Sequence, residues 1–184
     1  MASTENNYVT HGLRGQVGEL FVFKLVNGKT IVASPPHKSR NEPTEKQQKQ
    51  RELFQEAAIY GKTVMVTPEL KAKYVTSVPE GGSVYKVSLA DFMNAPKIKE
   101  VDVSEYVGDP GNTIRIRAID DFMVKNVAVT ITNEEGTLVE EGEAVKQRNG
   151  LDWLYTATVQ NDSFTGDKIV VRAYDLPGNV AVWD

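Results

Sequence analysis

The side chains that most often perform chemistry in proteins are scarce in this chain of 184 residues. It contains no cysteine, which excludes disulfides, thiolate metal sites and cysteine nucleophiles. Its two histidines, His11 and His37, offer little basis for a histidine-based metal site or acid–base centre. We therefore expect no enzymatic activity, no cofactor and no small-molecule substrate.

Carboxylates are the chemically useful groups that remain. Asp120-Asp121 and Asp175 each follow a predicted strand, and Asp109 lies in a turn rich in Pro and Gly. Hard oxygen ligands of this kind, gathered at loops, are the ligands that Ca²⁺ prefers. The alternative is that each aspartate accepts hydrogen bonds from the backbone of its own turn. No EF-hand spacing is present, so we favour turn chemistry and expect no metal, with Ca²⁺ binding by these four aspartates as the alternative.

A basic stretch at residues 37–51 supplies a second set of candidate binding residues: Lys38, Arg40, Gln47, Lys49 and Arg51. Basic side chains at a helix start can hold phosphate, which would favour nucleic acid. However, no aromatic residue interleaves with them, and the whole chain has a net charge of −4. We therefore favour a solvated helix face, with a polar contact to another protein as the alternative, over nucleic-acid binding.

The first half of the chain must position these basic residues. Asn27-Gly28 separates two β-rich runs, residues 19–26 and 29–34, which predicts a hairpin with a type I′ turn. Residues 1–18 are polar and contain three regularly spaced glycines, so we expect a flexible arm that orders on assembly.

Three helices are predicted after the hairpin. The first has Thr44 as its N-cap, with Gln47 at the spacing of a capping box. The second begins at Thr67 with Pro68 at its first position, and the third covers about residues 83–94. We expect residues 19–97 to form one module of a β-hairpin and three helices.

From residue 98 the hydrophobic period changes from 3.6 to 2. About seven short runs of alternating apolar residues, separated by turn signals, predict a β-sandwich over residues 98–184. Trp153 shares a strand face with other apolar residues and is expected in the core. Trp183 lies on the opposite face from Val182, and we expect it to pack on the helical module or on a neighbouring copy.

Residues 98–184 resemble a bacterial immunoglobulin-like domain. The resemblance is carried by three stretches, residues 114–121, 127–131 and 173–179, the last reading Ala-Tyr-Asp-Leu-Pro-Gly-Asn. The first half is similar to an uncharacterised domain of Bacteroidota proteins. That similarity rests on Gly15 to Gly18, Asn27 to Lys29 and the pattern from Thr44 to Phe54. The resemblances imply an architecture but no activity.

The predicted fold class is thus α+β, a hairpin and three-helix module followed by an immunoglobulin-like sandwich. Residues 1–97 hold 13 Lys/Arg and 9 Asp/Glu, whereas residues 98–184 hold 8 and 16, an asymmetry that favours contact between copies.

We expect a structural or interaction protein, a subunit or decoration of a larger assembly such as a phage particle, injection device or filament. The alternative is a module that binds carbohydrate through the sandwich. We see no signal peptide or membrane span, so we expect a cytoplasmic protein or a particle assembled there.

Overall fold

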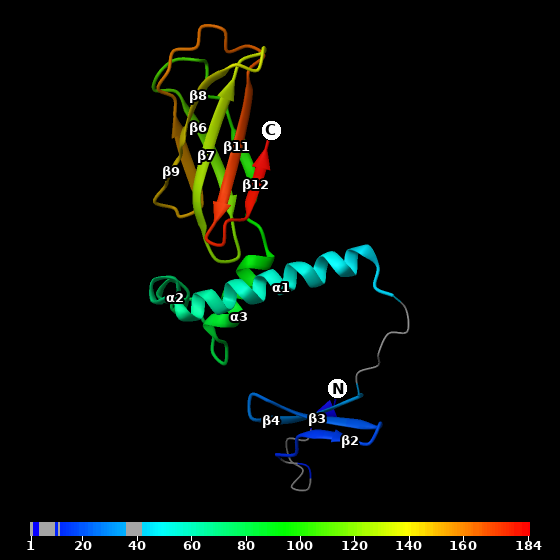
Figure 1. Ribbon diagram of the computed structural model, residues 1–184. Helices are drawn as coiled ribbons and strands as arrows, with labels where there is room; N and C mark the ends of the chain where they lie inside the picture. Colours follow the sequence, from blue (N-terminus) through cyan, green and yellow to red (C-terminus); the bar gives the residue numbers. More distant parts are fainter. Residues whose placement is uncertain (1, 4–9, 11, 36–41) are drawn as a thin grey trace. The chain divides into compact units, whose positions relative to one another are not determined.

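The computed structural model describes residues 2–3, 10, 12–35 and 42–184. The chain forms two compact units, residues 1–49 and residues 50–184. The fold is α+β, with helices and antiparallel sheets (Figure 1). Within the described ranges, no helix has the length and apolar character needed to cross a membrane.

The first unit contains a four-stranded antiparallel sheet, here called the N-terminal sheet. Its strand order is β1-β4-β3-β2, with bounds Ala2–Ser3, Lys29–Ala33, Phe21–Val26 and Gly15–Val17. The predicted hairpin joins β3 to β4, and Asn27 and Gly28 have φ of 49° and 78°, as a type I′ turn requires. Strands β1 and β2 come from the segment expected to be a flexible arm, of which residues 1, 4–9 and 11 lie outside the described residues.

Three helices follow, α1 (Glu45–Val66), α2 (Pro68–Val75) and α3 (Val84–Met93). The predicted capping box is confirmed, because Thr44 N donates to Gln47 Oε1 and Gln47 N donates to Thr44 Oγ1. Helix α1 continues through Gly61, which is buried against α3. A Cβ at Gly61 would lie 2.9 Å from the ring of Tyr85, so a glycine permits this close packing.

Residues 97–183 form two further antiparallel sheets of four strands each. The β6 sheet has the order β5-β6-β10-β9, with bounds Lys97–Asp102, Thr113–Ile119, Asp152–Thr156 and Val145–Lys146. The β7 sheet has the order β12-β11-β7-β8, with bounds Val180–Trp183, Lys168–Asp175, Val124–Thr132 and Leu138–Glu143. Each sheet combines strands from separate parts of this segment, so the chain crosses repeatedly from one sheet to the other (Figure 1).

One hydrophobic core lies between these two sheets. It combines alternate residues of β6 and β10 with alternate residues of β7 and β11, as the period of 2 predicts. Trp153 belongs to this core, which confirms its predicted burial. Trp183 is exposed on β12, an edge strand of the β7 sheet. Helices α2 and α3, which the sequence groups with the hairpin as residues 19–97, share their compact unit with these two sheets.

Candidate functional site

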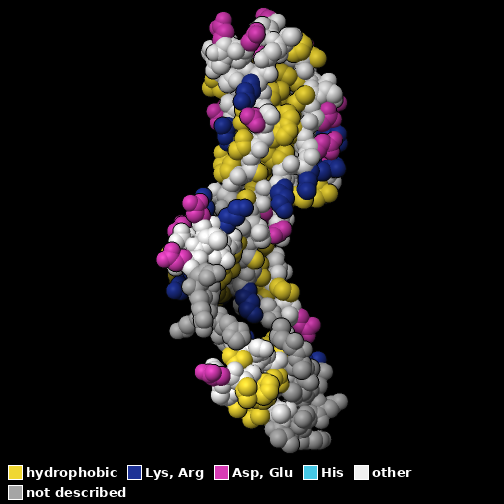
Figure 2. Space-filling model, turned by 90° about the vertical axis from the view of Figure 1, so that its right-hand side faces the viewer, with side chains coloured by type: hydrophobic (Ala, Val, Ile, Leu, Met, Phe, Trp, Pro, Cys, Tyr) yellow, Lys and Arg dark blue, Asp and Glu magenta, His cyan; other side chains and the backbone are white. Residues whose placement is uncertain are grey.

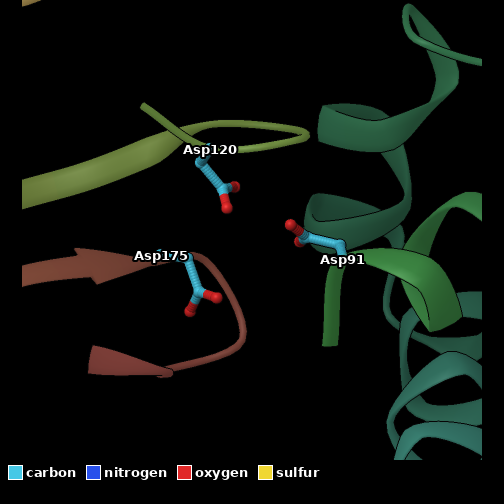
Figure 3. Close-up of side chains that lie close together, drawn as sticks. All are labelled: Asp91, Asp120 and Asp175. Atoms are coloured by element: carbon cyan, nitrogen blue, oxygen red, sulfur yellow. The ribbon is translucent and has the colours of Figure 1, made fainter. Parts of the chain in front are cut away.

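Three aspartates converge where α3 meets one end of the two packed sheets. Among the described residues, Asp91, Asp120 and Asp175 each offer a carboxylate oxygen, and these oxygens all lie within 4.8 Å of one another. Asp91 is in the last turn of α3, Asp120 follows β6, and Asp175 ends β11. Figure 3 shows the three side chains pointing toward one another from these elements. We call them the aspartate cluster.

Asp175 is fixed by the tight turn between β11 and β12. Its Oδ1 accepts hydrogen bonds from the backbone N–H groups of Gly178, at 2.8 Å, and Asn179, at 2.6 Å. Its Oδ2 accepts one from Asn179 Nδ2 at 2.7 Å. The same Nδ2 donates to the carbonyl of Phe92 at 3.0 Å. Asn179 therefore connects this turn to the end of α3.

Asp120 is fixed in the same manner by the loop between β6 and β7. Its Oδ2 accepts hydrogen bonds from the backbone N–H groups of Phe122, at 3.2 Å, and Met123, at 2.9 Å. Its Oδ1 is buried and has no hydrogen-bond partner. One oxygen of Asp120 thus stabilises the turn, while the other is left for the cluster.

Asp91 is held from the helical side by tyrosines. Its Oδ2 accepts a hydrogen bond from the Tyr74 hydroxyl at 2.5 Å, and the Tyr60 hydroxyl lies 2.9 Å from that of Tyr74. The ring of Tyr74 stacks on Phe122, with centroids 4.4 Å apart. Asp91 is only 1% exposed, and its Oδ1, like Asp120 Oδ1, is buried without a hydrogen-bond partner.

Three negatively charged carboxylates at this spacing repel one another. Within residues 42–184, which the structure describes without a gap, none of the three forms an ion pair. Burial, opposed by the Tyr74 hydrogen bond and reinforced by the charges of Asp120 and Asp175, raises the pKa of Asp91 to about 7. Burial also raises the pKa of Asp175, against its hydrogen bonds from Asn179 and Gly178. Positive charge at the cluster, from a proton or a cation, would relieve this repulsion.

Two cavities adjoin the cluster. One, of about 350 Å³, is lined by Asp120 together with Lys97, Lys99 and residues 93–96. The other, of about 290 Å³, is lined by Asp91 with Phe122 and residues of α3 and the turn before it. Asp91 and Asp120 each therefore line a cavity, while their two unpartnered oxygens are themselves buried.

The aspartate cluster contains two of the four candidate calcium ligands suggested by the sequence, together with Asp91, which was not among them. Asp120 and Asp175 belong to it, whereas Asp121 is exposed and outside it. Asp109 precedes β6 and Asp120 follows it, so the whole length of the strand separates them. Asp109 instead accepts a hydrogen bond from Gln160.

The sequence analysis missed Asp91. A usable signal was present, because Asp91 is seven residues after Val84 and three after Ser88, on the helix face that packs inward. An acidic residue on that face requires a partner, since burying an uncompensated charge is costly.

The basic candidates are not brought together into a site by the described residues. Lys38 and Arg40 lie outside the part of the chain that the structure describes. Gln47 completes the capping box, and Lys49 and Arg51 are exposed on the first turns of α1. Trp183 is exposed on β12.

Comparisons with known proteins add no family to this geometry. No protein-family model, no curated protein and no solved structure matches the chain.

Proposed function

We propose that the chain is a non-enzymatic structural protein that associates with further copies of itself in a larger assembly. The observation that carries this proposal is an apolar face of the N-terminal sheet on which five described side chains remain exposed or half-buried. We call it the apolar sheet face and define it by Val17, Phe21, Phe23, Leu25 and Val32.

Strand register places these five side chains on one face. Val17 pairs with Phe21 across β2 and β3, Phe23 pairs with Val32 across β3 and β4, and Leu25 alternates with them along β3. Val17, Phe21 and Leu25 are about half exposed. Figure 2 shows hydrophobic side chains gathered at the surface of this unit. A sheet usually buries one face against another layer, so this face is suited to a protein partner.

A second copy fits this face. None of the residues that β2, β3 and β4 place on it is charged, so two identical faces meet without like-charge repulsion. The sheet offers a contact of about 300 Å² per copy, less than the about 800 Å² per partner of a stable dimer. We therefore expect weak association of the free protein, reinforced by repeated contacts in an assembly.

The strand order of residues 97–183 supports an immunoglobulin-like sandwich as the second part of this subunit. Counted from β5, the β6 sheet pairs the first, second, sixth and fifth strands, and the β7 sheet pairs the eighth, seventh, third and fourth. With β8 as an additional edge strand beside β7, this order resembles that of immunoglobulin-like domains. Such sandwiches serve widely as spacers and decorations, and that analogy favours a structural role.

The alternatives receive less support from the positions of their residues. Trp153 and Tyr155 are buried in the core, so they offer no stacking platform for a sugar. Lys49 and Arg51 share the exposed start of α1 with Glu45 and Glu52, which weakens any phosphate-binding surface.

A single charge substitution with a matched control tests the proposal. Light scattering of the full chain should show an average mass that rises with concentration. Leu25→Lys should abolish that rise, whereas Val26→Lys should preserve it, because Val26 is equally exposed (45% against 48%) but lies on the opposite sheet face.

Circular dichroism checks that both variants are folded, and Val17→Lys on β2 repeats the test if Leu25→Lys is not. A monomer at every concentration, or an equal effect of Leu25→Lys and Val26→Lys, would contradict self-association through this face.

A further inference from the structure

We propose that the aspartate cluster is a Ca²⁺ site, in which Asp91, Asp120 and Asp175 bind one ion that joins the end of α3 to the two loops at this end of the sheets. The inference is independent of self-association, because the cluster lies in residues 50–184 and the apolar sheet face lies in the first unit.

The first argument comes from two oxygens without partners. Asp91 Oδ1 and Asp120 Oδ1 are buried and accept no hydrogen bond, and Figure 3 shows both side chains directed into the cluster. A buried polar atom without a partner is costly, and folded proteins rarely keep one. A cation between the two carboxylates would satisfy both oxygens at once.

The second argument is the separation of the oxygens. Ca²⁺ binds carboxylate oxygens at roughly 2.3–2.6 Å, so two ligands on opposite sides of the ion lie about 4.8 Å apart. The three cluster oxygens all fall within 4.8 Å of one another, which fits a single shared ion. Mg²⁺ usually keeps several water ligands and binds through one or two carboxylates, so three convergent carboxylates favour Ca²⁺.

The third argument is that the ligands are held in place by groups other than the ion. Asp120 Oδ2 is fixed by two backbone N–H groups, Asp91 Oδ2 by Tyr74, and Asp175 by its own turn. Each carboxylate thus keeps its orientation while oxygen lone pairs remain for coordination. The remaining carboxylate lone pairs and water from the cavities that adjoin Asp91 and Asp120 would complete the coordination of Ca²⁺.

The proposed ion would fasten three separate elements. Asp91 belongs to α3, whereas Asp120 and Asp175 belong to the loops after β6 and β11. Among the contacts between these parts, the hydrogen bond from Asn179 to the Phe92 carbonyl is one direct link. An ion bound to all three carboxylates would convert their mutual repulsion into a cross-link between the helices and the two sheets.

Binding can be measured on the full chain after removal of metal with a chelator. We expect Ca²⁺ to raise Tm by about 5–10 °C at a free concentration about 100-fold above Kd. Tb³⁺, which binds at Ca²⁺ sites, should give tyrosine-sensitised luminescence because the Tyr74 hydroxyl contacts Asp91. Added Ca²⁺ should displace it.

Asp91→Asn and Asp120→Asn are the informative variants. In each, the amide oxygen can keep the existing hydrogen bonds and the amide NH₂ can donate to the facing carboxylate, so the metal-free fold should survive. We expect both to lose the Ca²⁺-dependent rise in Tm and the Tb³⁺ signal. Asp121→Asn removes an adjacent, exposed carboxylate outside the cluster and should behave as wild type.

Three results would overturn the inference. The first is no Tm shift and no Tb³⁺ luminescence with the wild-type chain at millimolar ion. The second is a Ca²⁺ response in Asp91→Asn and Asp120→Asn that equals that of Asp121→Asn. The third is an equal or larger effect of Mg²⁺, which would contradict the assignment to Ca²⁺.

Discussion

At the scale of residues, the loop before β6 contains a close backbone contact at Gly108. Gly108 has a φ of +90°, and its carbonyl accepts a hydrogen bond from Asn161 N at 2.8 Å. A Cβ added at Gly108 would lie 2.2 Å from the Asn161 carbonyl oxygen, a distance that backbone atoms cannot accept without moving. Gly111, in the same loop, has a similar φ of +94° but open space around it.

Replacing these two glycines separates strain from steric contact. Gly111→Ala should cost about 1 kcal/mol, because only the positive φ is unfavourable. Gly108→Ala carries the same strain and must also displace the Asn161 backbone, so we expect a loss of about 3 kcal/mol or more. Urea unfolding of both variants gives the comparison. Equal losses would show that the loop relaxes around the added methyl group.

Single residues also show how far a sequence predicts a site. Asp120 and Asp175 could be named because each follows a run of alternating apolar residues and precedes a turn, which places both at strand ends. Asp91 could not be matched to them, because its partners are far away in the chain and only the packing of α3 brings it near. Asp109 and Asp121 have the same residue type and similar surroundings in sequence, and nothing local distinguishes them from true members of the cluster.

At the scale of elements, strands β6 and β10 are joined by an ion pair. Arg117 and Asp152 are direct cross-strand partners. Arg117 Nε donates to Asp152 Oδ1 at 2.8 Å and a terminal nitrogen donates to Oδ2 at 3.2 Å. The Arg117 hydrogen bonds, followed by one from Asn149, hold the pKa of Asp152 below its ordinary value. A depressed pKa means that the folded state favours the charged carboxylate.

The stabilisation from this pair should depend on pH in a defined direction. It should be complete above the unfolded pKa of Asp, about 3.9, and should disappear as pH falls through the lower pKa of folded Asp152. Arg117→Gln should therefore lower Tm at pH 7 and have a progressively smaller effect as pH falls below about 3.9. Thermal unfolding across pH, with the exposed Arg148→Gln as control, measures this. A pH-independent difference would contradict the assignment to Asp152.

Elements with local signals were predictable, and those defined by distant contacts were not. The Asn27-Gly28 turn and the Thr44–Gln47 capping box are both present, because each is determined by two to four adjacent residues. Strands β1 and β2 were not expected, since they are two and three residues long and form by pairing with β4 and β3. Helix α1 runs without a break through Gly61, and the absence of a side chain at this residue leaves room for the ring of Tyr85.

At the scale of the whole molecule, the two units differ in how well they bury apolar residues. In the first unit, the described residues of the N-terminal sheet include only one buried side chain, that of Thr30. In the second unit, Ile114, Ile116, Val127, Val129 and Val171 are fully buried between two sheets. Because burial of apolar surface is the main source of stability, the free energy of opening should differ strongly between the units.

Hydrogen exchange of the full chain should reveal this difference. At low protein concentration, amides of β3 and β4 should exchange at least about 100-fold faster than amides of β6, β7 and β11, because a sheet whose described side chains are mostly exposed opens at lower free energy. Raising the concentration should slow exchange in β3 and β4 alone, since a second copy on the apolar sheet face would bury its exposed side chains. The strands of the second unit provide the internal control, because their core is complete in each chain. Slow, concentration-independent exchange in β3 and β4 would mean that their own chain already covers this face, and the apolar sheet face would then lose its role in assembly.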